Sequence, residues 1–160
     1  MNVGVICSRE LVAVDAASSL LQVARLMFEH HVGAVVVTKS PMDRPVPVGM
    51  ITDRDITRAQ LEGANNLSRL TAVSVMTHDP LVLVEDMSVD DAIGRMRSRG
   101  VRRAPVVSLD GALIGLISTD DLIAYVAREL TTLSRLLEMQ PLFERLHPPG
   151  TATPRPLPTK

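Results

Sequence analysis

Aromatic residues are nearly missing from this chain of 160 residues, which has no Trp, one Tyr and two Phe. Proteins that bind single-stranded nucleic acids stack the bases on aromatic side chains, and most nucleic-acid binders display a cluster of basic residues. Here 17 Lys and Arg residues are balanced by 18 Asp and Glu residues, and the net charge is −1. The composition therefore predicts that nucleic acid is not a partner.

Cysteine is also scarce. Cys7 is the single cysteine, which excludes an internal disulfide framework and a cysteine-based metal site. No His or acidic residue is spaced to activate Cys7 as a nucleophile, so we expect a small buried apolar side chain there. His30 and His31 are adjacent and would not share a helix face, and no third ligand is evident, so we expect no metal.

Groups that carry out catalysis are missing as well. The sequence offers no nucleophile–base pair, no cluster of metal ligands and no phosphate-binding glycine loop. It therefore predicts a protein that is not an enzyme and needs no catalytic cofactor.

Long hydrophobic runs do not occur. No 18 consecutive residues are apolar, and the N-terminal MNVGVICSRELVAVD lacks the basic start and apolar stretch of a signal peptide. We therefore expect no membrane contact and a cytoplasmic location. Hydrophobic residues still make up 46% of the chain, enough to bury the core of one domain or of two small halves.

What the chain does contain is two copies of one unit. Residues 12–38 align with residues 81–107 at an offset of 69, because 81 minus 12 is 69. The segment GMITDRDI (49–56) aligns with GLISTDDL (115–122) at an offset of 66, because 115 minus 49 is 66. The difference of three residues falls between these blocks, in a loop, and loop insertions cost little stability. The pattern indicates a duplicated fold.

Each copy has the pattern β-α-β-β-α. A short extended run precedes Ser19 in the first copy and Ser88 in the second, and each serine begins a capping box that predicts a helix start. Gly100 is placed to end the helix that follows Ser88. Two β-branched runs come next, and a second helix is expected to begin at Thr52 in one copy and at Ser118 in the other.

The pattern also predicts a domain organisation. We expect a first repeat at 1–63, a tether at 64–74 and a second repeat at 75–140 whose last helix ends at Pro141. Residues 141–160 have the composition of a disordered tail. One such unit has too small a core to be stable alone, so we predict an α/β (mixed α+β) fold in which two β-α-β-β-α repeats pack through their sheets with pseudo-twofold symmetry.

At this point the chain resembles a tandem pair of CBS domains, also called a Bateman module. The resemblance covers residues 5–130 and depends on the order and duplication of motifs that are weak alone. The motifs are VMTHDP (75–80), SVDDAIGRM (88–96), GVRRAPVV (100–107), GMITDRDI and GLISTDDL. The first copy departs from the pattern: Cys7–Leu11 replaces Met76–Pro80, and Gly33–Val36 stands where the second has Arg102–Pro105. With no catalytic or membrane domain attached, the sequence resembles a stand-alone CBS pair.

The resemblance implies a non-catalytic sensor. Members of the family bind AMP, ADP, ATP or S-adenosylmethionine in clefts between the two repeats, and many form dimers. In their G-h-h-T/S-x-x-D motif (h, hydrophobic) the Asp holds the ribose hydroxyls, and the Thr or Ser lies near the ribose or phosphate. Carried over, this nominates Thr52 and Asp55 for one cleft, and Ser118 and Asp121 for the other.

The residue types suit that ligand class. A carboxylate can accept hydrogen bonds from both ribose hydroxyls, and a helix N-terminus attracts phosphate. Arg54, Arg102 and Arg103 could supply positive charge, since an arginine fork matches phosphate geometry. Two simpler interpretations stay open: Thr52 and Ser118 cap helices, and the arginines are solvated surface charges.

The last helix suggests a partner. It carries more apolar side chains than one small domain needs, and they could contact a second copy in a homodimer or pack back on the chain's own sheet. They are Leu130, Leu133, Leu136 and Leu137. The leading hypothesis is a regulatory protein that reports an adenosine ligand to a protein partner, and the alternative is a ligand-free dimerisation scaffold.

Overall fold

A computed structural model describes residues 1–39, 44–62 and 66–146 of the chain. The predicted tail beyond residue 146 and part of the predicted tether lie outside these residues. The chain divides into two compact units: the first, Met1–Leu122, contains both sheets, and the second begins at Ile123. None of the helices in the described ranges is long and apolar enough to cross a bilayer.

The three strands of the first repeat and β4 (Thr77–His78), from the start of the second repeat, form a four-stranded sheet with helices packed against it. Strands β1 and β2 are parallel, whereas the β2–β3 and β3–β4 pairs are antiparallel. Helix α2 begins at Ser19, whose side chain and that of Gln22 form the predicted capping box. The elements are α1 (Val3–Ile6), β1 (Ala13–Asp15), α2 (Leu20–Glu29), β2 (Ala34–Lys39), β3 (Val46–Thr52) and α3 (Asp53–Leu61).

The second repeat has the same strand directions in a sheet of three strands. Strand β5 pairs with β6 in parallel and β6 with β7 antiparallel, and Ser88 caps α5 as expected. Gly100 ends α5 in the left-handed conformation, with φ 65°. The elements are η1 (Leu67–Arg69), α4 (Ala72–Val75), β4 (Thr77–His78), β5 (Leu83–Val84), α5 (Val89–Arg99), β6 (Arg103–Val107), β7 (Leu113–Ser118) and α6 (Thr119–Leu146).

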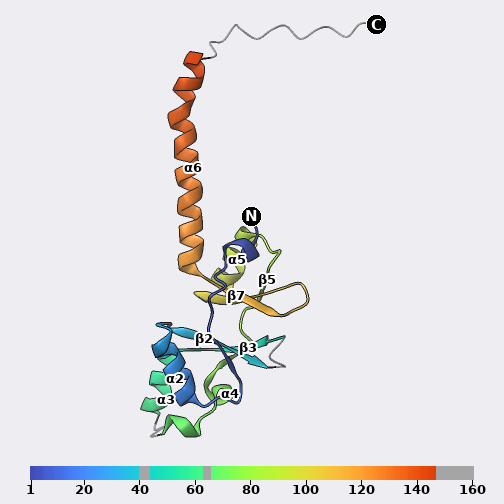
Figure 1. The fold of residues 1–160 in the computed structure, drawn as a ribbon, viewed down its shortest axis with the longest axis vertical. Helices are drawn as coiled ribbons and strands as arrows, with labels where there is room; N and C mark the ends of the chain where they lie inside the picture. Colours follow the sequence, from blue (N-terminus) through green and yellow to red (C-terminus); the bar gives the residue numbers. More distant parts are fainter. Residues whose placement is uncertain (40–43, 63–65, 147–160) are drawn as a thin grey trace, which may run out of the picture. The chain divides into compact units, whose positions relative to one another are not determined.

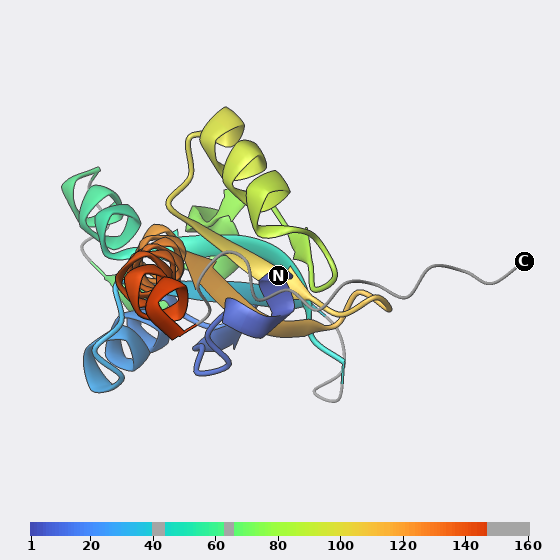
Figure 2. The ribbon, with the colours of Figure 1, turned by 90° about the horizontal axis from the view of Figure 1, so that it is seen from above.

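The two sheets of the first unit face each other, with α2, α3 and α4 beyond one sheet and α5 beyond the other (Figures 1 and 2). The mixed α+β architecture of two repeats agrees with the predicted fold class. Strand β2 is buried on both faces over residues 34–38, whereas toward its end β3 alternates, with Gly49 and the fully buried Ile51 turned to the core. Val23 and Met27, four residues apart on α2, are buried in the same core.

The short helix that begins each repeat, α1 or α4, packs against the other repeat. The backbone N–H of Val3 in α1 donates to Met87 O in the second repeat, at 2.9 Å. The matching N–H of Ala72 in α4 donates to Ser18 O in the first repeat, at 2.8 Å. Ala72 is fully buried in the core of the first repeat, together with Met76. The segment expected to be a tether therefore supplies part of that core. The domain boundaries given above stay a prediction.

Two glycines allow the exchanged segments to approach. A Cβ added at Gly115 would lie 2.7 Å from both Cys7 Sγ and Ser8 O, and one at Gly49 would lie 2.7 Å from Met76 Cγ. Gly49 and Gly115 are equivalent at the offset of 66, and Cys7 and Met76 at the offset of 69. In each repeat, therefore, a glycine in the last strand makes room for the segment of the other repeat that passes over that strand. Cys7 is buried, as its isolation in the sequence suggested.

Helix α6 is longer than expected. It runs from Thr119 to Leu146 and passes through Pro141, so the prediction that it ends at Pro141 was wrong. A proline removes one backbone donor and disfavours a helix interior, but the energetic penalty is finite and a helix can continue past it. The four leucines expected at a contact are all exposed: Leu130, Leu133, Leu136 and Leu137.

Candidate functional site

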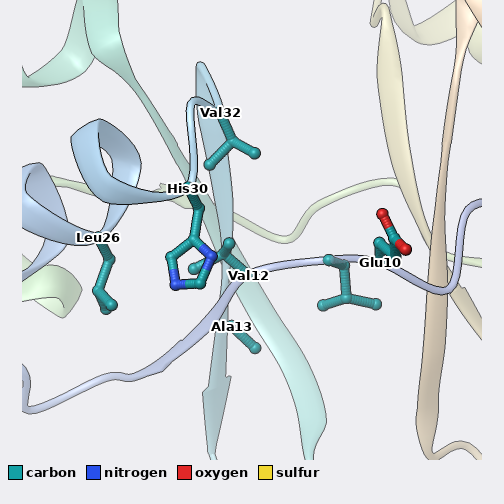
Figure 3. A pocket seen from close by; sticks show the side chains of 7 residues that line it. Glu10, Val12, Ala13, Leu26, His30 and Val32 are labelled. Carbon is teal, nitrogen blue, oxygen red and sulfur yellow. The ribbon is translucent and has the colours of Figure 1, made fainter.

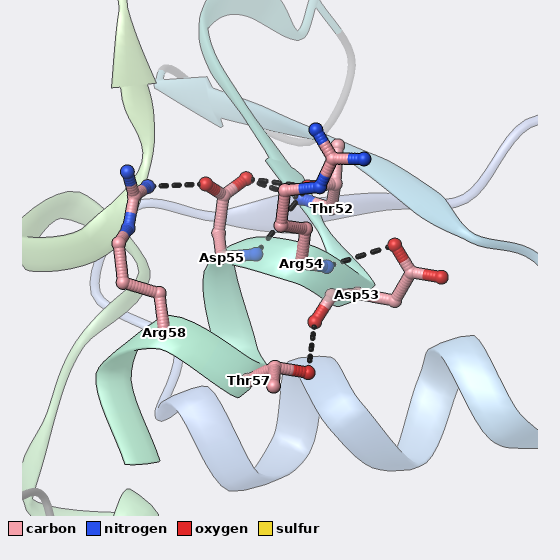
Figure 4. Close-up of polar contacts among 6 residues, drawn as sticks. All are labelled: Thr52, Asp53, Arg54, Asp55, Thr57 and Arg58. Atoms are coloured by element: carbon pink, nitrogen blue, oxygen red, sulfur yellow. Dashed lines mark hydrogen bonds and ion pairs between the residues drawn. The ribbon is translucent and has the colours of Figure 1, made fainter. Parts of the chain in front are cut away.

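The first candidate corner lies where β3 ends and α3 begins. Thr52 is the N-cap of α3, and both its backbone N–H and its hydroxyl donate to Asp55 Oδ2, at 2.9 and 2.7 Å (Figure 4). The backbone N–H of Asp55 donates to Thr52 Oγ1 at 3.4 Å, which completes the capping box. Asp55 is 7% exposed, one of two buried polar residues among those described. The structure thus joins the predicted Thr–Asp pair.

The second corner repeats this geometry between β7 and α6. The Ser118 backbone N–H and hydroxyl donate to Asp121 Oδ2 at 2.8 and 2.6 Å, and the Asp121 N–H donates to Ser118 Oγ at 3.2 Å. Both predicted pairs therefore form, with the same atoms in the same roles. Capping explains these bonds fully. A hydroxyl and a carboxylate at a helix N-terminus can also bind hydroxyl groups and anions, so capping does not exclude a ligand.

The three predicted arginines are placed differently from one another. Arg54 is exposed, and among the described residues no bond from its guanidinium is drawn in Figure 4 or recorded elsewhere. Arg103 begins β6 directly opposite Ser118 in the ladder. Arg102 precedes it, and its carbonyl accepts hydrogen bonds from the backbone N–H and hydroxyl of Thr119, at 2.9 and 3.1 Å. The structure thus brings Arg102 and Arg103 to the second corner.

Sequence reasoning missed Arg58. Its Nη2 lies 2.5 Å from Asp55 Oδ1, an ion pair within α3. An acidic and a basic residue three positions apart on a helix are neighbours, so the spacing D-x-x-R carried the signal. Both carboxylate oxygens of Asp55 therefore have a partner within the protein before any ligand binds.

Two pockets lie in the first unit. One of about 580 Å³ is lined by Asp55, Arg58, Ala59, Glu62 and residues near α4. The other, of about 540 Å³, lies between α2 and the segment that leads into β1, where His30 and Leu26 stand beside Val12 (Figure 3). Both volumes fall within the range of small-molecule sites. Asp55 is the one predicted site residue that lines either pocket.

The thiol of Cys7 is not activated. Burial raises the pKa of the Cys7 thiol, and the negative charges of Asp121 and Glu85 add to this effect, while nearby Arg9 opposes it. A raised pKa keeps the thiol protonated and unreactive. Within the described residues, no group of three His, Cys, Asp or Glu side chains could hold a metal ion.

Comparison with known proteins places this geometry in context. The chain is 28% identical over 123 residues to protein MK0525 of Methanopyrus kandleri, a match that covers 77% of this chain and 61% of that protein. The chain therefore matches somewhat less than two thirds of that relative.

Solved structures share the fold at low sequence identity. CBSX2 in complex with AMP has a TM-score of 0.68 at 22% identity, and the match covers 79% of this chain and 96% of that one. The CBS domain pair of MJ0100 in complex with 5′-methylthioadenosine and S-adenosyl-L-methionine has a TM-score of 0.67, also at 22% identity, over 81% of this chain and 98% of that one. The family model of the CBS domain matches residues 3–62 and 72–128. The chain belongs to the CBS domain family and contains a tandem pair of these domains.

Proposed function

We propose that this chain is a cytoplasmic, non-catalytic regulatory protein that binds an adenosine-containing ligand between its two CBS repeats. The ligand would be AMP, ADP, ATP or S-adenosylmethionine. The binding residues would be Thr52, Arg54 and Asp55 at one corner, and Ser118, Asp121, Arg102 and Arg103 at the other.

The duplicated corner carries this proposal. Each corner holds a hydroxyl and a carboxylate at a helix N-terminus, and each lies at the end of a strand crossed by a segment of the other repeat. Ser8 bridges to Leu116 in β7, and Thr77 pairs with Met50 in β3. A ligand at either corner would thus be within reach of both repeats, which is what a regulatory ligand requires.

Related structures support the ligand class. AMP, 5′-methylthioadenosine and S-adenosyl-L-methionine, the ligands named for two structures of the same fold, all contain adenosine. Of these, only AMP has a phosphate. The ribose and adenine are therefore the shared features that the corner carboxylates and surrounding apolar side chains would bind.

Regulation would follow from differential affinity. A ligand changes the relative arrangement of the repeats only as far as it binds one arrangement more tightly than another. The surfaces that respond would include the exchanged helices α1 and α4, since each contacts the repeat to which it does not belong in sequence. A protein partner would detect that change.

Thermal denaturation with AMP, ADP, ATP and S-adenosylmethionine tests the proposal. At 100 times its dissociation constant, a ligand of the folded state stabilises by about 2.7 kcal/mol, which raises Tm by roughly 5 to 10 °C for a chain of this size. NAD is included to distinguish adenosine binding in general from binding of these ligands. The absence of a shift with every compound would contradict the proposal.

Dimerisation is the second candidate function, and one observation favours it. Along α6, Ile123, Val126, Leu130, Leu133 and Leu137 follow each other at alternating spacings of three and four, and all are exposed. This spacing is typical of a helix that pairs with another helix. A homodimer through α6 is therefore our proposal for the oligomeric state, and analytical ultracentrifugation of the chain and of Leu130→Asp would test it.

A further inference from the structure

The two corners differ in how many carboxylate oxygens are occupied. At the first corner, Asp55 Oδ2 accepts from Thr52 and Asp55 Oδ1 is paired with Arg58 at 2.5 Å. At the second corner, Asp121 Oδ2 accepts from Ser118 in the same way. Asp121 Oδ1 has no recorded partner among the described residues. The sequence explains the difference, because Arg58 is replaced by Ala124 at the equivalent position, 58 plus 66.

This difference affects binding of a ribose. A ribose presents two hydroxyl donors and needs acceptor lone pairs that are not already used. Asp121 Oδ1 can accept hydrogen bonds from both ribose hydroxyls without breaking an existing bond. At Asp55, Oδ2 already accepts two hydrogen bonds and Oδ1 accepts one from Arg58, so one acceptor position remains for two ribose hydroxyls unless the ribose displaces the guanidinium.

The arginines are also placed differently at the two corners. Arg103 stands directly opposite Ser118 in the β6–β7 ladder, and side chains of opposite residues lie on the same face of a sheet. The equivalent residue in the first repeat, opposite Thr52, is Ala34. The ion pairs recorded for the described residues do not include Arg102 or Arg103. Each corner therefore has an arginine outside the ion pairs of the described residues: Arg103 at the second corner and the exposed Arg54 at the first, whose equivalent at the second corner is Asp120.

On these contacts, and building on the proposed function, we infer that the two corners bind unequally. The Asp121 corner is the higher-affinity site for the ribose of an adenosine ligand. The Asp55 corner is a weaker site, because Arg58 competes with the ribose for Asp55 Oδ1. Arg58 is therefore a residue that sets the order in which the sites fill.

The size of the Arg58 effect follows from its exposure. The Arg58 side chain is 59% exposed, so solvent screens its attraction to Asp55. Exposed ion pairs of this kind correspond to at most about a fivefold change in an equilibrium constant. We expect Arg58→Ala to strengthen the weaker site by about two- to fivefold and to leave the tighter site unchanged.

Isothermal titration calorimetry of the full chain with AMP tests this inference. The unmodified chain should show two unequal sites. Asp121→Ala should remove the tighter one, and Arg58→Ala should bring the two affinities closer. The reverse substitution, Ala124→Arg, restores the D-x-x-R spacing at the second corner and should weaken the tighter site by about two- to fivefold. Arg97→Ala, an exposed arginine on α5, is the matched control and should change neither site.

Several results would overturn the inference. These are equal affinities at the two sites, retention of the tighter site in Asp121→Ala, and an Arg58→Ala variant that binds AMP more weakly or no differently. Weaker binding in Arg58→Ala would mean that Arg58 contacts the ligand instead of excluding it. Asp121→Asn, which keeps the size of the side chain, is measured beside Asp121→Ala. Far-ultraviolet circular dichroism checks that each variant is folded.

Failure of the proposed function gives a different result. In that case neither AMP nor S-adenosylmethionine produces binding heat with the unmodified chain, and both the ligand assignment and the order of the sites are rejected.

Discussion

The first and second repeats share their backbone contacts but not the charges at their corners. Val3 donates to Met87 just as Ala72 donates to Ser18, and Ser118 caps α6 with the same bonds that Thr52 uses for α3. Yet only one corner carries an arginine three residues after its aspartate. The duplicated contacts are those that packing requires, whereas the one that differs comes from Arg58, whose side chain is 59% exposed and is not needed for packing.

The left-handed turns after α2 and α5 also keep the same backbone geometry although their residues differ. Gly100 has φ 65° and ends α5, and its equivalent His31 has φ 53° after α2. The turn is therefore kept in both repeats, although in the first a residue with a Cβ has to adopt a conformation that favours glycine. Backbone geometry has remained equivalent where the residue type has not.

The largest expected effect tests whether the repeats form one cooperative unit. Ile51 and Ile117 are equivalent, and both are fully buried. Ile51→Ala and Ile117→Ala should each lower the free energy of unfolding by about 2–5 kcal/mol, because each leaves a cavity in a core. Because the leading helices are exchanged, we expect one transition in urea for both variants. Two separate transitions, with each variant shifting a different one, would show that the repeats unfold independently.

A smaller effect distinguishes Gly115, which Cys7 and Ser8 contact, from Gly49, which Met76 contacts. In Gly115→Ala the new Cβ would collide with the backbone oxygen of Ser8, whereas in Gly49→Ala it would meet the flexible side chain of Met76. We therefore expect Gly115→Ala to destabilise by about 1–3 kcal/mol and Gly49→Ala by less. Urea denaturation of both variants measures the difference, and a larger loss in Gly49→Ala would contradict the reasoning.

The smallest effect concerns the turn after the first helix of each repeat. His31→Gly should stabilise the chain by about 0.5–1 kcal/mol, since glycine relieves the left-handed strain but increases the entropy of the unfolded chain. Gly100→Ala should destabilise it by about 1 kcal/mol. Opposite signs in thermal denaturation are the expected result. Destabilisation by His31→Gly would mean that the histidine side chain contributes contacts that outweigh the strain.

Local features of the fold could be predicted from the sequence because their signals are local. The capping boxes at Ser19 and Thr52, and the glycine end at Gly100, depend on residues a few positions apart. The pairing of Thr52 with Asp55 followed from the same spacing. Arg58 could have been found in this way too. Its spacing of three residues from Asp55 is as local a signal as the capping box, but the capping box and the ribose role account for Asp55 without a third partner.

The end of α6 and the exchange of α1 and α4 could not be predicted in this way. Pro141 is a strong local signal to stop, and the helix continues beyond it to Leu146. The segment before Met76 has the composition of a linker, but Ala72 is fully buried against the first repeat. Its burial depends on a surface formed by residues more than 40 positions earlier in the chain, such as Val23 and Met27.

The sequence by itself determined that this protein is a duplicated CBS unit with a hydroxyl–carboxylate corner in each half, since duplication, caps and hydrophobic periodicity are all visible in the order of residues. Only the tertiary structure decided that each repeat is completed by a helix from the other. It also decided that both oxygens of Asp55 accept bonds, whereas within the part of the chain that the structure describes only Oδ2 of Asp121 does. The physical reason is that burial and hydrogen-bond satisfaction depend on which surfaces meet in space, and those contacts join residues that are far apart in the chain.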